Sequence, residues 1–171
     1  MEFSDVIKNR YSCKKFSSEQ IGKDKLDAIL EAGRVAPTAK NLQEQHIYVV
    51  QSESALETID KLTPCRYNAP TVLIVAYNKN NVFTYLGDKR NSGIEDATIV
   101  ATHLMLAAYN EGVDSCWINF FNPDELAKAF NLPEDEEILM LLDLGVADKT
   151  TTPLPNHCLL YTSPSPRDRS L

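Results

Sequence analysis

The stretch SGIEDATIVATHLMLAAYNEGVDSCWIN, residues 92–119, combines high apolar density with a length that suits a long helix followed by a strand. Between residues 97 and 109 only two threonines and one histidine are clearly polar. A helix that is apolar nearly all round is usually buried. Gly112 is well placed to end this helix. We therefore predict a buried central helix, followed by a strand over residues 115–120.

Small residues gather on one side of this helix. At helical spacing they allow another backbone to pack closely, and they are Ala97, Val100, Ala101, Leu104 and Ala108. The sequence thus predicts a tight packing contact along the central helix.

Composition limits the class of protein. The 171 residues are 43% hydrophobic and 24% charged, which is typical of one globular domain. A net charge of -7 argues against nucleic acid or an anionic membrane as the main partner. No segment resembles a signal peptide or a membrane span, so we expect a cytoplasmic protein. The four cysteines show no metal-ligand spacing, so we expect free thiols and no metal site.

The remaining chain alternates between helical and strand-like patterns. Helices are predicted near residues 4–10 and 23–34, around Leu56, Ile59 and Leu62, and from Asn122 to about Phe130. Strands are predicted over residues 46–51, 71–77 and 137–145, in addition to the one after the central helix. The irregular order indicates an α+β fold with a mixed or antiparallel sheet flanked by helices. No Gly-rich phosphate loop is present.

The segment after the first helix carries two cations. Arg10, Ser12 and Lys14 alternate, so an extended chain would present all three on one side. A hydroxyl between two cations suits a phosphate or another anion. The alternative is an ordinary solvated edge.

Two further stretches have both a functional and a structural interpretation. Residues 36–43, APTAKNLQ, offer donors and acceptors for the polar edge of a heterocycle, or simply form a capped turn. The strand carrying Trp117 leads to two phenylalanines that could flank a planar ligand, or belong to the core. No catalytic role is assigned to any histidine, and no triad is suggested by spacing.

These stretches, taken together and in order, resemble the FMN-dependent nitroreductase family over about residues 1–157, and its short, single-domain members most. RYSCKKF (10–16) is similar to the family's R-x-S-x-[RK]-x-F. APTAKNLQ (36–43) is similar to its A-P-S-x-x-N-x-Q. GVDSCWI (112–118) is similar to its G-L-G-S-C-W-I.

The resemblance implies a nitroreductase-like fold that forms a homodimer through the central helix, with FMN bound across the interface. Ala97, Ala101, Leu104 and Ala108 then become a candidate dimer contact. The implied cofactor-binding residues are Arg10, Tyr11, Ser12, Lys14, Pro37, Thr38, Ala39, Asn41, Gln43, Ile118, Asn119 and Phe120. Arg10 and Ser12 would hold the phosphate and ribityl chain, and Lys14 the pyrimidine edge. The loop of residues 37–43 would come from the other subunit.

The implied activity is hydride transfer from NAD(P)H through the flavin to a nitroaromatic, quinone or similar small acceptor. The flavin carries this chemistry, so no protein triad is required. The alternatives are a flavin-binding or sensing protein with little turnover, and a truncated product with impaired FMN binding. The family loop often continues Q-P-W, whereas Glu44 and Gln45 follow here. The acceptor and the choice between NADH and NADPH are left open.

The C-terminal composition differs from the rest. CLLYTSPSPRDRSL, residues 158–171, has no amphipathic period and resembles the translation of a sequencing-library adaptor. We expect a single FMN-binding domain over residues 1–157 and a non-native, disordered tail over residues 158–171. The family usually has a phosphate-clamping cation beyond His157, so we expect this chain to bind FMN weakly and dimerise poorly beside a version with a natural ending.

Overall fold

The computed structural model describes residues 1–87 and 90–155 and has an α+β architecture built on a four-stranded sheet. The strands are β1 (Gln45–Val50), β2 (Thr71–Asn78), β3 (Asp114–Ile118) and β4 (Glu136–Gly145). The helices are α1 (Phe3–Asn9), α2 (Lys23–Arg34), α3 (Glu53–Leu62), α4 (Gly93–Asn110) and α5 (Pro123–Ala129), with a short 3-10 turn η1 (Ala39–Asn41). The strand order is β1-β2-β4-β3, and each neighbouring pair is antiparallel. The expected mixed or antiparallel sheet is thus antiparallel.

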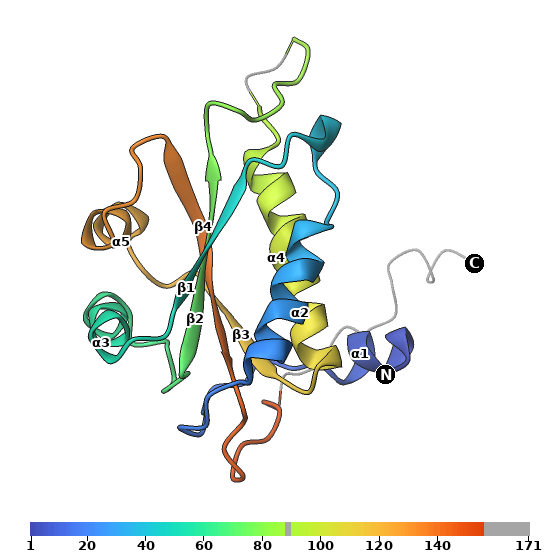
Figure 1. Cartoon of the computed structure of the whole chain (residues 1–171), viewed down its shortest axis with the longest axis vertical. Helices are drawn as coiled ribbons and strands as arrows, with labels where there is room; N and C mark the ends of the chain where they lie inside the picture. The colour runs from blue at the N-terminus through green and yellow to red at the C-terminus, as the bar shows by residue number, and fades with distance from the viewer. Residues whose placement is uncertain (88–89, 156–171) are drawn as a thin grey trace, which may run out of the picture.

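Helices cover both faces of the sheet. α2 and α4 pack together on one face, while α3 and α5 lie on the other (Figure 1). β2 is buried because its side chains enter two cores in turn, Leu73 and Val75 on the α2/α4 side and Ile74 and Ala76 on the other. This explains why the predicted strand over residues 71–77 shows no polar alternation.

α4 confirms the predicted central helix and its stop. Gly112 adopts φ +68, a left-handed conformation that favours glycine. Its N–H donates to Tyr109 O at 3.0 Å, and Val113 N–H donates to Ala108 O at 2.8 Å. These two bonds form a Schellman motif, which satisfies carbonyls at the helix end and turns the chain into β3.

The small-residue side of α4 faces the interior of its own chain. Its five members have no exposed surface even in a single copy, and they are Ala97, Val100, Ala101, Leu104 and Ala108. The interpretation of four of them as a dimer contact is therefore wrong, because nothing of these side chains remains for a partner. The apolar side chains that α4 does expose include Ile94 and Ile99, which are 57% and 37% exposed.

The other predicted elements are present with shifts of one or two residues. α5 begins as expected, since Asn122 Oδ1 accepts hydrogen bonds from Asp124 N–H (3.1 Å) and Glu125 N–H (3.4 Å). α1 spans Phe3–Asn9, so it begins and ends one residue earlier than predicted. β3 ends at Ile118, two residues earlier than predicted.

The remaining expectations concern the C-terminal residues, the cysteines and the absence of a membrane span. The predicted tail over residues 158–171 and the predicted domain end at His157 lie outside the described residues. Cys13, Cys65 and Cys116 are free thiols. In residues 1–87 and 90–155, no helix combines the length and apolar character needed to cross a membrane.

Candidate functional site

The segment after α1 runs along the outer edge of the sheet. Ser12 pairs with Ser115 of β3 in parallel, and Cys13 N–H donates to Ser115 O at 2.9 Å. This pairing holds the segment extended, so that Cys13 is buried while Ser12 and Lys14 are exposed. The predicted alternation is present over residues 12–14, whereas Arg10, at the end of α1, is half-buried.

The outward side chains of this segment make no hydrogen bonds or ion pairs with the described residues. Within residues 1–87 and 90–155, no side-chain hydrogen bond or ion pair engages Arg10, Ser12 or Lys14. Lys15 differs, because its Nζ forms an ion pair with Asp148 at 3.2 Å and donates to Thr150 Oγ1 at 2.8 Å. Arg10 and Lys14 are thus available to an anion, whereas Lys15 ties the segment to the chain after β4.

Tyr11 lies on the inward side of the segment and packs against the same core as Cys13. Burial, with a smaller contribution from Asp114, raises the pKa of Tyr11 to about 12. Burial likewise raises the pKa of Cys13, and it raises that of Cys116 to about 12. These groups stay protonated near neutral pH, so the thiols are unreactive core residues.

The chain beyond β3 offers two backbone donors. Trp117 Nε1–H donates to Asn119 Oδ1 at 2.8 Å, and Thr63 Oγ1 donates to Phe120 O at 2.7 Å. These bonds fix the turn, while the N–H groups of Asn119 and Phe120 have no acceptor in the described part of the chain. The Phe120 side chain is 71% exposed. Backbone donors beside an exposed ring suit the edge and face of a planar ligand.

The loop between α2 and β1 is strained. Lys40, Asn41 and Gln43 adopt φ values of 51, 54 and 53, in the left-handed region that side chains disfavour. Thr38 Oγ1 accepts from Gln43 N–H at 3.0 Å, and Asp96 Oδ1 accepts from Ala39 N–H at 2.8 Å. Such strain gathers at functional sites. Glu44, the next residue, is buried although it carries a carboxyl group, and the sequence analysis did not identify it as part of a site.

The predicted site residues form two groups in one chain. Arg10, Ser12 and Lys14 lie beside β3, whose start follows the C-terminal end of α4, whereas Ala39 is bonded to Asp96 at the other end (Figure 1). At 1.5 Å per residue, α4 separates Asp96 from its last turn by about 20 Å. The segment by β3 and the loop of residues 37–43 therefore do not meet within one copy.

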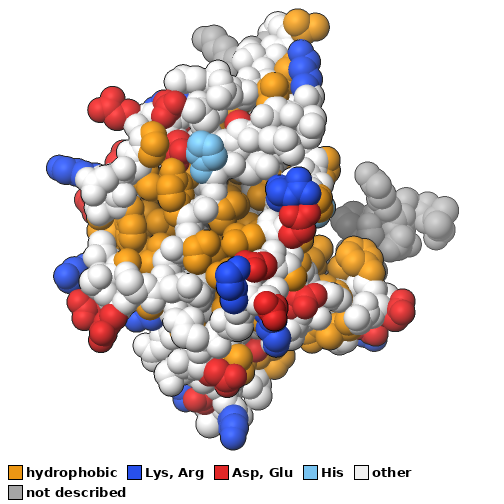
Figure 2. Space-filling view, viewed as in Figure 1, with side chains coloured by type: hydrophobic (Ala, Val, Ile, Leu, Met, Phe, Trp, Pro, Cys, Tyr) orange, Lys and Arg blue, Asp and Glu red, His pale blue; other side chains and the backbone are white. Residues whose placement is uncertain are grey.

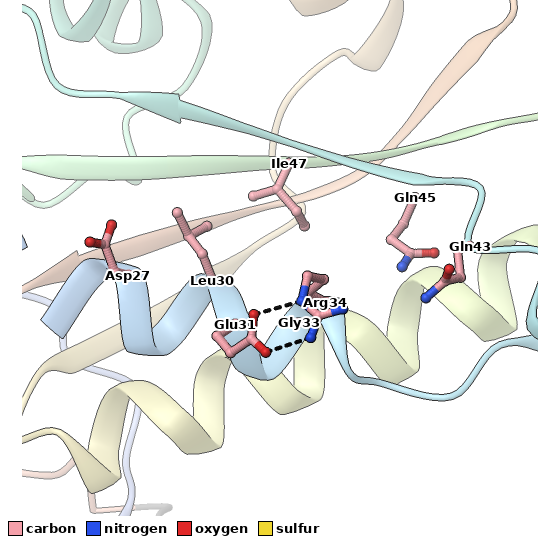
Figure 3. Close-up of a pocket in the computed structure, with 8 residues that line it drawn as sticks. All are labelled: Asp27, Leu30, Glu31, Gly33, Arg34, Gln43, Gln45 and Ile47. Carbon is pink, nitrogen blue, oxygen red and sulfur yellow. Dashed lines mark hydrogen bonds and ion pairs between the residues drawn. The ribbon is translucent and has the colours of Figure 1, made fainter. Parts of the chain in front are cut away.

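A cavity of about 590 Å³ lies between α2 and β1 (Figure 3). Of the predicted cofactor-binding residues it contains only Gln43, with Gln45 beside it. Arg34 forms a two-bond ion pair with Glu31 at its rim, both distances being 2.6 Å. The cavity is separate from the cationic segment, because none of Arg10, Ser12 and Lys14 lines it.

Comparisons with known proteins agree with this fold. The model of the Nitroreductase family matches residues 7–66 and 63–146. A nitroreductase family protein from Clostridium difficile 630 has a solved structure that superposes with a TM-score of 0.88 at 30% identity, covering 99% of this chain and 96% of that one.

Two further relatives carry functional names. The Bacillus subtilis protein "Putative NAD(P)H nitroreductase YodC" is 28% identical over 183 residues, covering 85% of this chain and 89% of that protein. An FMN-dependent nitroreductase from Clostridium difficile R20291 has a TM-score of 0.75 at 25% identity, covering 94% of this chain and 96% of that one. The matched residues include both the segment after α1 and the loop before β1, and on this evidence the chain belongs to the Nitroreductase family.

Proposed function

We propose that this chain is an FMN-dependent oxidoreductase that takes hydride from NAD(P)H and delivers it to a nitroaromatic, quinone or similar small acceptor. Family membership supports the class of reaction. One observation carries the cofactor assignment: two cations flank a hydroxyl on the exposed side of an extended segment, and none of the three has a protein partner among the described residues. This donor set fits a phosphate with a polyol chain.

The remaining residues fit the rest of the flavin. Arg10 and Ser12 would bind the phosphate and the ribityl hydroxyls, and Lys14 would stabilise negative charge at the pyrimidine edge. The free N–H groups of Asn119 and Phe120, next to Ile118, would donate to the ring system near N5. Bound FMN would supply the hydride chemistry that no side chain here provides.

The loop would complete the site from a second copy. Pro37, Thr38, Ala39, Asn41 and Gln43 would face the flavin bound by the partner's cationic segment. The distance of about 20 Å along α4 supports this arrangement, because one chain holds halves of two sites.

A homodimer also accounts for the exposed apolar surface. Phe3 and Ile7 of α1 are 67% and 51% exposed, and Ile94 and Ile99 of α4 are also uncovered. A cavity of about 410 Å³ lies between the two helices. Apolar side chains also gather over another face, around β1 (Figure 2). An exposed apolar patch such as the one around β1 often marks an interface.

The activity test is an anaerobic titration. We expect the protein to bind added FMN, to bleach when NADH or NADPH is added, and to recover its colour with a nitroaromatic or a quinone. Stable colour without bleaching would instead indicate a flavin-binding protein with little turnover. No binding even in excess FMN would contradict both assignments.

The site test uses Arg10→Ala with Lys8→Ala as a matched control. Lys8 is a neighbouring exposed cation on α1, outside the predicted set. Losing a charged hydrogen bond should weaken FMN binding about 10- to 100-fold for Arg10→Ala and leave the control close to wild type. Sedimentation of the FMN-loaded protein should give a dimer. A flavin-bound monomer would contradict the shared site.

A further inference from the structure

Two buried carboxyl groups, those of Glu44 and Asp96, lie close enough to interact electrostatically. Glu44, just before β1, and Asp96, in the first turn of α4, are each 3% exposed. Both oxygens of Glu44 and Oδ2 of Asp96 are buried and have no hydrogen-bond partner in the described residues. The remaining oxygen, Asp96 Oδ1, accepts from Ala39 N–H at 2.8 Å. A proton shared by the two carboxyls would give these oxygens a hydrogen bond that the described residues do not otherwise supply.

Among the described residues, the charged groups near the pair have other partners. Lys40, the cation of the loop, has its Nζ over the Phe83 ring, 4.7 Å from its centre. Glu95, beside Asp96 on α4, accepts a hydrogen bond from Tyr85 OH. On the connection before α4, Arg90 lies over the Tyr85 ring at 5.2 Å.

Burial is the main reason that the pKa of Glu44 rises to about 7; the polar backbone of Glu44 itself lowers it in part, and Asp96 raises it further. The proton therefore leaves the pair near neutral pH, when two adjacent carboxylates would repel each other.

Asp96 also determines the shape of the loop. Lys40, Asn41 and Gln43 keep their left-handed backbone only while surrounding bonds hold it. Within the loop Thr38 contributes to that hold, and outside it the bond between Asp96 and Ala39 and the contact of Lys40 with the Phe83 ring do so. A displacement of Asp96 would release the tie between the loop and α4.

We propose that Glu44 and Asp96 share one proton, and that this proton holds the loop of residues 37–43 in the shape that contacts FMN bound by the partner subunit. The proton passes to solvent as the pH rises, the two carboxylates separate, and the loop loses its FMN-binding shape. Glu44 is thus a positioning residue. The inference rests on the proposed function, which supplies FMN as the ligand.

The first test measures the Kd of FMN against pH. If binding requires the shared proton, one-proton linkage at a pKa of about 7 weakens binding about tenfold between about pH 6 and about pH 8. Glu44→Gln cannot ionise, so its Kd should lack this dependence and retain only that of the FMN phosphate. Glu95→Gln removes a charge from the same helix turn without touching the pair. It should follow wild type.

The second test needs no flavin. Amide exchange of Ala39 N–H in the apoprotein reports the tie to Asp96 directly. Its protection factor should fall about tenfold between about pH 6 and about pH 8 in wild type, and stay constant in Glu44→Gln.

The outcomes separate this inference from the proposed function. Failure to bind FMN at any pH would overturn the function, while Ala39 exchange would still decide the proton pair. Equal protection in wild type and Glu44→Gln across this range would overturn the pair. If the Kd of FMN changed with the concentration of added sodium or potassium and not with pH, the proton pair would also be overturned, because a bound cation would then take the place of the proton.

Discussion

Asp143 lies near the end of β4 with no exposed surface, and neither of its carboxyl oxygens has a hydrogen-bond partner in the described residues. Its strand neighbours are Val72 and Cys116, which belong to the apolar core. Arg66 is the cation that acts on it, but the Arg66 guanidinium already donates to both oxygens of Asp60 at 2.7 and 2.5 Å. Burial therefore dominates, and it raises the pKa of Asp143 from 3.8 to about 9.

This shift has a definite cost and sign. At pH 7 the unfolded chain has an ionised Asp143, whereas the folded chain keeps the proton. Because pH 7 is roughly three units above the usual pKa, folding must bind a proton to Asp143, and this lowers the free energy of unfolding by about 4 kcal/mol. Asp143→Asn removes this cost because the amide does not ionise. The N–H groups that the amide adds destabilise the fold by about 1–3 kcal/mol if they stay unsatisfied. The net effect of Asp143→Asn at pH 7 is therefore stabilisation by about 1–3 kcal/mol.

The pH dependence is the decisive measurement. Urea unfolding followed by the fluorescence of Trp117, the chain's one tryptophan, gives the free energy of unfolding at each pH. The advantage of Asp143→Asn should grow by about 1.4 kcal/mol per pH unit between about pH 5 and about pH 8. Asp148→Asn is the control, because hydrogen bonds from Thr150 lower the pKa of Asp148 to about 2, so it is ionised in both states over this range. An advantage of Asp143→Asn that does not change with pH would refute a buried, protonated Asp143.

Two further predictions concern packing and capping. A Cβ at Gly33 would lie 2.7 Å from Leu104 Cδ2, so Gly33→Ala should destabilise the fold by about 1–3 kcal/mol. Gly22→Ala is the control, because a Cβ there meets nothing within 4 Å. Equal melting temperatures of the two variants would show that α2 and α4 separate freely. Asn122→Ala removes the cap of α5 and should lower the free energy of unfolding in urea by about 1 kcal/mol. Ser52→Ala is the control, because Ser52 precedes α3 without a side-chain cap bond, and it should lower that energy little. Equal losses in the two variants would contradict the capping role of Asn122.

The sequence predicts the elements better than their contacts. The central helix, its stop at Gly112 and the cap at Asn122 depend on local backbone chemistry, which a single sequence contains. Which face of α4 points inward does not depend on local chemistry alone. The helix is apolar nearly all round, so its sequence period does not distinguish the inward face from the others. The small residues suit contact with any close backbone, and the structure shows that this backbone is α2, where Gly33 meets Leu104.

The candidate site divides in the same way. Arg10, Ser12 and Lys14 could be grouped from their alternation alone, because an extended chain fixes which side chains share a side. Glu44 could not be placed, since a carboxylate in a predicted loop is ordinarily solvated. Its burial depends on α4 bringing Asp96 against it, a contact between residues distant in sequence.

α4 therefore has a second role besides filling the core. Its first turn carries Asp96, which accepts a hydrogen bond from Ala39 of the loop. Its C-terminal end at Gly112 leads into β3, which pairs with the segment containing Ser12. Because one helix carries both ties, the two half-sites of a chain attach at points about 20 Å apart along α4. If each half-site belongs to a different flavin, a change in the loop of one copy acts on FMN held by the cations of the other. The buried proton at Glu44 would then regulate binding across the interface and not within its own chain.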